Sequence, residues 1–266
     1  MNDRERRAAA ASAAADGAAA SIELRPRPGR VLLTLLPVIV LLIAGHLLTF
    51  TILRSNGMPE AGPLRSLFRV FNLGAERNLP TLFSVFQLVV AAALLATSAW
   101  LGRARGRPWV AWAMLAGIFV VLAVDELMLI HERFNQVGER FVEADGFLHF
   151  AWVVPYAAIV VVLLVAFVPF LLRLPPRTRW LFIASGGIFV GGAMGLEMLS
   201  GRMVGSAGFM SWPHLLAFTA EESAEMVGIA LFVYALLDHL RQEGLRIRLD
   251  AAPVDAVRAE GPRDSS

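Results

Sequence analysis

Six long apolar stretches, separated by short polar connections, dominate the pattern of the 266-residue chain. Each is about 20 residues or slightly longer, which at 1.5 Å per residue is enough to cross the ~30 Å hydrocarbon core of a bilayer. The pattern therefore predicts an all-α, polytopic membrane protein with six transmembrane helices at residues 31–53, 79–101, 108–130, 150–172, 180–199 and 218–240.

The composition agrees with a membrane domain. Hydrophobic residues make up 57% of the chain and charged residues 17%, whereas soluble domains are about half apolar and a quarter charged. We expect a single transmembrane domain at residues 31–240, between disordered cytoplasmic tails at residues 1–30 and 241–266. Because the chain has no Cys, disulfides and thiolate metal sites are excluded.

Arginine clusters set the predicted orientation. The chain has 24 Arg and no Lys, and most of the Arg lie before the first stretch, in the second and fourth connections, and after the last stretch. The positive-inside rule places these segments and both termini in the cytoplasm. The first connection also carries several Arg on the predicted outside, but they are widely spread. Since no nucleic-acid-binding motif is present, nucleic acid is not an expected partner. The expected location is a bacterial inner (plasma) membrane, which the chain would cross several times.

Shorter elements and packing can also be predicted from spacing. Residues 63–72 have an apolar face at helical spacing, which is typical of an amphipathic helix in the headgroup region, and residues 131–150 are expected to be partly helical. In the fifth span, Gly187, Gly191 and Gly195 recur every four residues. Small residues at this spacing let backbones approach closely, so we expect this helix to be central and tightly packed.

Acidic residues inside the apolar stretches are the strongest functional signal. A charge at this depth costs roughly 3 kcal/mol, so such residues tend to face a bundle interior and to function there. With the orientation above, counting along the helices places six carboxylates in the outer half of the membrane: Asp125, Glu126, Glu197, Glu221, Glu222 and Glu225. We predict that Asp125, Glu197 and Glu225 converge, with side chains within about 10 Å of one another.

Carboxylates at one depth need a proton, a cation or an Arg to neutralise them, and no Arg lies within the hydrophobic depth. One hypothesis is a divalent metal ion of undetermined identity, bound by His131, Glu197, Glu221 and Glu225. Carboxylate and His ligands would also suit a di-iron centre. A network of protonated carboxyls that only locks helix packing is the structural alternative. In the enzymatic reading the catalytic groups are Asp125, Glu126 and Glu222.

Other polar and aromatic residues near the outer boundary receive plainer interpretations. His46 stands alone on an apolar face, so we expect a core histidine rather than a ligand. Trp152 and Trp212 are expected to belong to the interfacial aromatic belt.

Three sequence blocks resemble a family of uncharacterised bacterial integral membrane proteins: residues 76–84, Asp125-Glu126 followed by His131-Glu132, and residues 221–228. The resemblance covers residues 31–240 and brings no established activity. The spacing of Glu76, Asn78 and Ser84 is also similar to the CREST group of ceramidase-like, metal-dependent membrane hydrolases, which implies substrate-binding roles for these three residues. The Ser-x3-His and His-x3-His motifs of that group are missing, since Phe218 stands four residues after His214.

The leading hypothesis is a membrane-embedded, metal-dependent hydrolase of a lipid or lipid-linked substrate, in which the metal activates water or polarises a substrate oxygen. The alternative is a proton- or cation-coupled transporter that uses the same carboxylates. Transporters often have an inverted repeat or a helix that is broken in the middle of the membrane. The sequence shows neither feature, which argues mildly against transport. A structural or partner-binding protein is a third reading. Lipid and a small-molecule substrate are the expected partners, and the sequence alone does not decide whether the chain is an enzyme.

Overall fold

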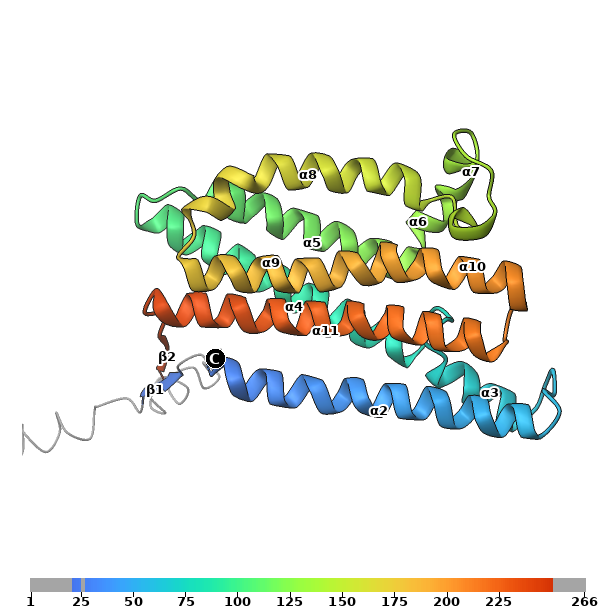
Figure 1. The fold of residues 1–266 in the computed structure, drawn as a ribbon. Helices are drawn as coiled ribbons and strands as arrows, with labels where there is room; N and C mark the ends of the chain where they lie inside the picture. The colour runs from blue at the N-terminus through green and yellow to red at the C-terminus, as the bar shows by residue number, and fades with distance from the viewer. Residues whose placement is uncertain (1–20, 25–26, 251–266) are drawn as a thin grey trace, which may run out of the picture. The chain divides into compact units, whose positions relative to one another are not determined.

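The computed structural model describes residues 21–24 and 27–250 (Figure 1). Within these residues, six helical segments are long and apolar enough to span a membrane, so the prediction of an all-helical, multi-pass membrane domain is confirmed. They are α2 (Pro28–Ser55), α4 (Leu79–Ala104), α5 (Val110–Met128), α8 (Val153–Arg173), a fifth span that joins α9 (Pro176–Val190), η2 (Gly191–Leu196) and α10 (Glu197–Ala207), and α11 (Trp212–Gln242).

Helix α11 is the centre of the membrane domain. In its most apolar window 61% of the residues are buried and in that of α4 44%, against only 17% for the fifth span. The prediction of a central fifth span is therefore wrong. Its glycines Gly187, Gly191 and Gly195 have no atom within 4 Å of an added Cβ. The close approach uses another glycine, because a Cβ on Gly228 of α11 would lie 2.8 Å from the backbone nitrogen of Phe189.

Short helices gather at one end of the bundle, which we call the α3 end (Figure 1). They are α3 (Pro63–Phe71), α6 (Ile130–Arg133), α7 (Asn135–Gly138) and the 3-10 turn η1 (Gly146–Leu148). The predicted surface helix and the partly helical connection are thus confirmed as helices. Helix α3 packs on α2 through Phe68, which is buried against Phe50 and His46. His46 is fully buried and its Nδ1 accepts a hydrogen bond from the Leu73 N–H at 3.3 Å, as expected of a core histidine.

An aromatic cluster lies in the part of the bundle away from the α3 end. Phe232 of α11 stacks on Phe119 of α5 with ring centroids 4.8 Å apart, and contacts Phe182 of α9 at 4.6 Å. Trp112 extends the cluster to Phe170 of α8 at 5.0 Å. We call these five residues the aromatic cluster. Along their helices they lie farther from the α3 end than the carboxylates of the predicted constellation.

A separate two-stranded ribbon joins the described parts of the two tails. Strand β1 (Ser21–Leu24) pairs antiparallel with β2 (Ile247–Asp250), with Ser21 opposite Asp250 and Leu24 opposite Ile247. This pairing was not predicted. The predicted disorder of residues 1–20, 25–26 and 251–266 falls outside the described residues. Their disorder and the cytoplasmic location of both termini stay predictions.

Candidate functional site

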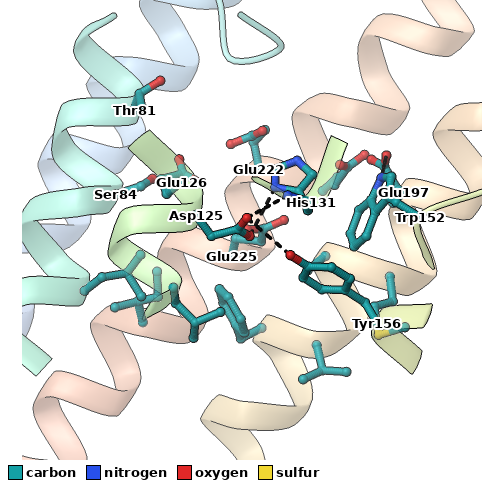
Figure 2. Close-up of a pocket in the computed structure, with 18 of the residues that line it drawn as sticks. Thr81, Ser84, Asp125, Glu126, His131, Trp152, Tyr156, Glu197, Glu222 and Glu225 are labelled. Carbon is teal, nitrogen blue, oxygen red and sulfur yellow. Dashed lines mark hydrogen bonds and ion pairs between the residues drawn. The ribbon is translucent and has the colours of Figure 1, made fainter. Parts of the chain in front are cut away.

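A cavity of about 150 Å³ lies between α4, α5, α8, the fifth span and α11 (Figure 2). Among the described residues, seven acidic side chains and one His line it: Glu76, Asp125, Glu126, His131, Glu197, Glu221, Glu222 and Glu225. No Arg is among the described residues that line it. We call it the acidic cavity. The structure thus brings Asp125, Glu197 and Glu225 to one enclosed space, together with the other predicted carboxylates.

The end of α5 orients His131 toward Asp125. Helix α5 was predicted to continue to residue 130, but it ends at Met128 because Leu129 adopts a left-handed conformation, with φ 56° and ψ 46°. The resulting turn lets the His131 N–H donate to Asp125 Oδ1 at 2.7 Å, and places His131 Nδ1 3.2 Å from Asp125 Oδ2. In an unbroken helix His131 would lie about a third of a turn away from the face of Asp125, so the break is what brings the two together.

The Asp125 carboxylate also sets the protonation of His131. Burial lowers the pKa of the ring, but the hydrogen bond and the charge of Asp125, with the charges of Glu76 and Glu126, raise it by more. The net effect is a pKa above the usual 6.5. In the neutral ring, a proton on Nδ1 directed at Asp125 leaves Nε2 as the acceptor nitrogen.

Two aromatic residues at the start of α8 complete this wall of the acidic cavity, and Figure 2 shows both directed at carboxylates. The Tyr156 hydroxyl donates to Asp125 Oδ1 at 3.3 Å, and Trp152 Nε1 donates to Glu197 Oε1 at 3.1 Å. Only 8% of Trp152 is exposed, so its assignment to the interfacial belt is wrong. Tyr156 was missed, although it is the one polar side chain in α8 before the terminal Arg173.

The fifth span and α11 supply the remaining carboxylates. The widened π-helical turn η2 directly precedes Glu197, and such turns often occur at functional sites. Gly192 in η2 lets α11 approach, because a Cβ there would lie 3.1 Å from the Glu221 carbonyl oxygen. Glu221 is 8% exposed, and its Oε2 has no hydrogen-bond partner among the described residues. A buried oxygen without a partner indicates that a proton, water or ligand is needed there.

Two further residues that line the acidic cavity are Glu76, from the connection between α3 and α4, and Ser84, from the first turns of α4. Desolvation, with the negative charges of Glu126 and Glu132, raises the pKa of Glu76 to about 7. Asn78 does not line the cavity. Its Oδ1 accepts from the Thr81 N–H at 3.2 Å, and its Nδ2 donates to the Asn72 carbonyl at 2.6 Å. The predicted substrate-binding role of Asn78 is therefore replaced by capping of α4, which holds the Glu76 loop in place.

Residues 32–240 match a family model described as "Domain of unknown function (DUF8692)". The chain belongs to this family. No curated protein and no solved structure matches the chain. All residues of the acidic cavity fall within the matched range, so the cavity is a feature of the DUF8692 domain of this chain.

The predicted metal ligands His131, Glu197, Glu221 and Glu225 all line the acidic cavity. Within the part of the chain that the structure describes, no group of three or more His, Asp and Glu side chains is arranged to hold a metal ion. His131 is bonded to Asp125 and Glu197 to Trp152, and the His131 and Trp152 rings are in contact, with centroids 4.9 Å apart. The divalent-metal and di-iron sites stay predictions, and we assign no chemical step to a metal.

Proposed function

We propose that this protein is a membrane-embedded hydrolase that acts on a lipid-type substrate by acid–base chemistry in the acidic cavity. The hydrogen-bonded group of Asp125, His131 and Tyr156 is the observation that carries the proposal. General base catalysis needs a base whose tautomer and orientation are fixed by a further group, and Asp125 does this for His131. The surrounding bundle would limit access of bulk water to this site.

The proposed reaction is attack of water on a carbonyl carbon of the substrate. His131 Nε2 takes a proton from the water as the new carbon–oxygen bond forms, and Asp125 stabilises the imidazolium that results. The Ser84 hydroxyl, buried on the α4 side, is available to donate to the developing oxyanion. The leaving group departs with a proton from Glu76, which keeps its proton up to its pKa of about 7. Glu126 and Glu222 would contact the polar part of the substrate.

The aromatic cluster supports hydrolysis over transport. A proton or cation path needs polar groups or water through the depth of the bundle. Below the acidic cavity the described interior residues Phe119, Phe182 and Phe232 pack ring against ring. Asp238 lies near the end of the bundle opposite the α3 end. Its Oδ2 accepts a hydrogen bond from Arg177 Nε at 2.7 Å, so this carboxylate does not face the acidic cavity. The acidic side chains of the cavity therefore gather toward one end of the bundle, with packed aromatic rings beyond them.

The test is hydrolysis of a panel of ester- and amide-linked lipids by the full chain in nanodiscs, with products measured by mass spectrometry. We expect His131→Gln to reduce turnover by about 10²–10⁴-fold, the usual contribution of a general base. His149→Gln is the matched control, because His149 packs against Phe150 and Phe209 and is not among the residues lining the acidic cavity. Turnover by His131→Gln at the wild-type rate would contradict the proposal. Repeating the assay after chelation tests the metal hypothesis separately.

A further inference from the structure

A second cavity, of about 250 Å³, adjoins the acidic cavity inside the bundle. Its walls come from α5, α8, α9 and α11, and its described lining residues are apolar apart from Ser185. We call it the apolar cavity. Five residues line both cavities: Leu122, Val160, Phe189, Val190 and Ile229. The two spaces therefore adjoin at these five residues, with acidic side chains on one side and hydrocarbon side chains on the other.

Helix α8 covers the apolar cavity loosely. Of its 21 residues only Val153 and Phe167 are buried. Leu164 lines the cavity and is nevertheless 56% exposed. In a bilayer this side of α8 faces lipid chains, so a hydrocarbon chain can reach the apolar cavity sideways from the membrane core.

The acidic side chains of the cavity select the other end of a ligand. Seven of them line it, with no Arg among the described lining residues. An anionic head group such as a phosphate or carboxylate would find no basic side chain there to pair with. A cationic nitrogen would instead favour the ionised form of these side chains and donate charge-assisted hydrogen bonds to them. The unpartnered Oε2 of Glu221, on a side chain that is 8% exposed, is available to accept one of them.

We propose that the two cavities together bind a single-chain amphiphile with a positively charged amine, whose nitrogen lies among Glu221, Glu222 and Glu225 and whose chain occupies the apolar cavity. This inference rests on the proposed function, since it names the class of substrate or product that the hydrolase site would take. Binding itself requires no turnover, so the two can be tested apart.

Two adjacent glycines of α9 provide a matched pair of variants. Gly186 lines the apolar cavity, and an added Cβ there meets no atom within 4 Å. Gly187 is equally unobstructed but does not line the cavity. Gly186→Phe should therefore fill the apolar cavity, whereas Gly187→Phe makes the same change of residue type on an exposed face of the same helix.

The experiment measures binding of dodecylamine, butylamine and dodecanoate to the full chain in nanodiscs by native mass spectrometry, with empty nanodiscs as the blank. We expect wild type to bind dodecylamine at least about tenfold more tightly than either other probe, a difference that corresponds to about 1.4 kcal/mol. Gly186→Phe should weaken dodecylamine about tenfold and leave butylamine unchanged, while Gly187→Phe should bind as wild type does. The double variant Glu222→Gln, Glu225→Gln should weaken both amines.

Equal binding of dodecanoate and dodecylamine would overturn the amine assignment, and unchanged dodecylamine binding by Gly186→Phe would overturn the chain site. If Gly186→Phe does not fold, Leu163→Trp on the α8 wall of the apolar cavity serves as the second filling variant. Dodecylamine binding by a protein that hydrolyses no lipid would uphold this inference and refute the hydrolase. If the protein hydrolyses lipid, and both filling variants bind dodecylamine and turn over lipid as wild type does, the hydrolase would be upheld and this inference refuted.

Discussion

At the scale of single residues, the site is held by two unusual backbone conformations. Arg77 and Leu129 are non-glycine residues with φ of 57° and 56°, and each lies within two positions of a side chain that lines the acidic cavity, Glu76 or His131. A left-handed conformation costs a residue with a Cβ roughly 1–2 kcal/mol. Strain of this kind persists where the surrounding structure enforces it, and it is often found at functional sites. Both turns aim a titratable group at the cavity, which is consistent with a role for these groups in proton transfer.

The shifted pKa values of Glu76 and His131 predict how stability depends on pH. Both groups bind a proton more tightly in the folded protein than in the unfolded chain. The contribution of Glu76 is present below pH 4.5 and is lost as the pH rises toward about 7. That of His131 is present below 6.5 and is lost as the pH rises through its higher folded value. The unfolding temperature in mild detergent should therefore fall across this range.

Single substitutions separate the two contributions. Glu76→Gln should flatten the decrease between pH 4.5 and about 7, and His131→Gln should flatten its upper part. Glu60→Gln, in the first outer connection and outside the acidic cavity, is the control and should leave the profile unchanged. A wild-type unfolding temperature that rises over this interval would show that other groups dominate.

At the scale of elements, the contact between the fifth span and α11 holds the carboxylates of both segments at one level. It depends on glycines that face the partner helix, namely Gly192 in η2 and Gly228 in α11. The stripe of Gly187, Gly191 and Gly195 faces away from the bundle, since nothing lies within 4 Å of a Cβ at any of the three. Helix rotation of the fifth span thus decides which glycines allow close packing.

This contact predicts opposite effects of two Gly→Ala substitutions. Gly228→Ala should destabilise the protein by about 1–3 kcal/mol, because the new methyl group would lie against the backbone of Phe189 and the helices would have to separate. Gly187→Ala, in the same pair of helices but facing away, should be neutral or stabilising by up to about 1 kcal/mol through helix propensity. Chemical unfolding followed by circular dichroism measures both. Equal effects of the two changes would contradict the observed rotation of the fifth span.

At the scale of the whole molecule, polar chemistry and apolar packing divide the bundle along its axis. The acidic cavity lies toward the α3 end and the aromatic cluster toward the other end. The apolar cavity lies between them, because some of its lining residues also line the acidic cavity and others belong to the aromatic cluster. The acidic cavity thus lies nearer one end of the bundle than the other. Which side of the membrane that end faces depends on the orientation of the bundle, for which the Arg distribution is the available argument.

Reporter fusions test that orientation. Fusions after Arg105 and Arg177 should report the cytoplasmic side, and fusions near Glu143 and Ser206 the opposite side, because the Arg-rich connections resist translocation. This result would place the acidic cavity in the outer half of the membrane. The reverse pattern would place it next to the cytoplasm, and a hydrolase there would act on lipids of the inner leaflet.

The sequence by itself determined the six spans and the depth of the carboxylates. Span length and apolar content are local properties, and depth follows from counting at 1.5 Å per residue. Because a carboxylate facing lipid is costly, depth also predicted that Asp125, Glu197 and Glu225 would share an interior space. These inferences need no knowledge of which helices are neighbours.

Only the tertiary structure decided how each helix is rotated and where its regular path is broken. The left-handed conformation at Leu129, which turns His131 toward Asp125, occurs at a residue other than glycine, so the sequence does not indicate it. At the depth of Trp152, a side chain can face either lipid or Glu197, and only the structure shows that it faces Glu197. The outward glycine stripe and the cavity beneath α8 likewise depend on contacts between distant segments. Rotation about a helix axis leaves span length and residue depth unchanged, so neither measure could reveal these features.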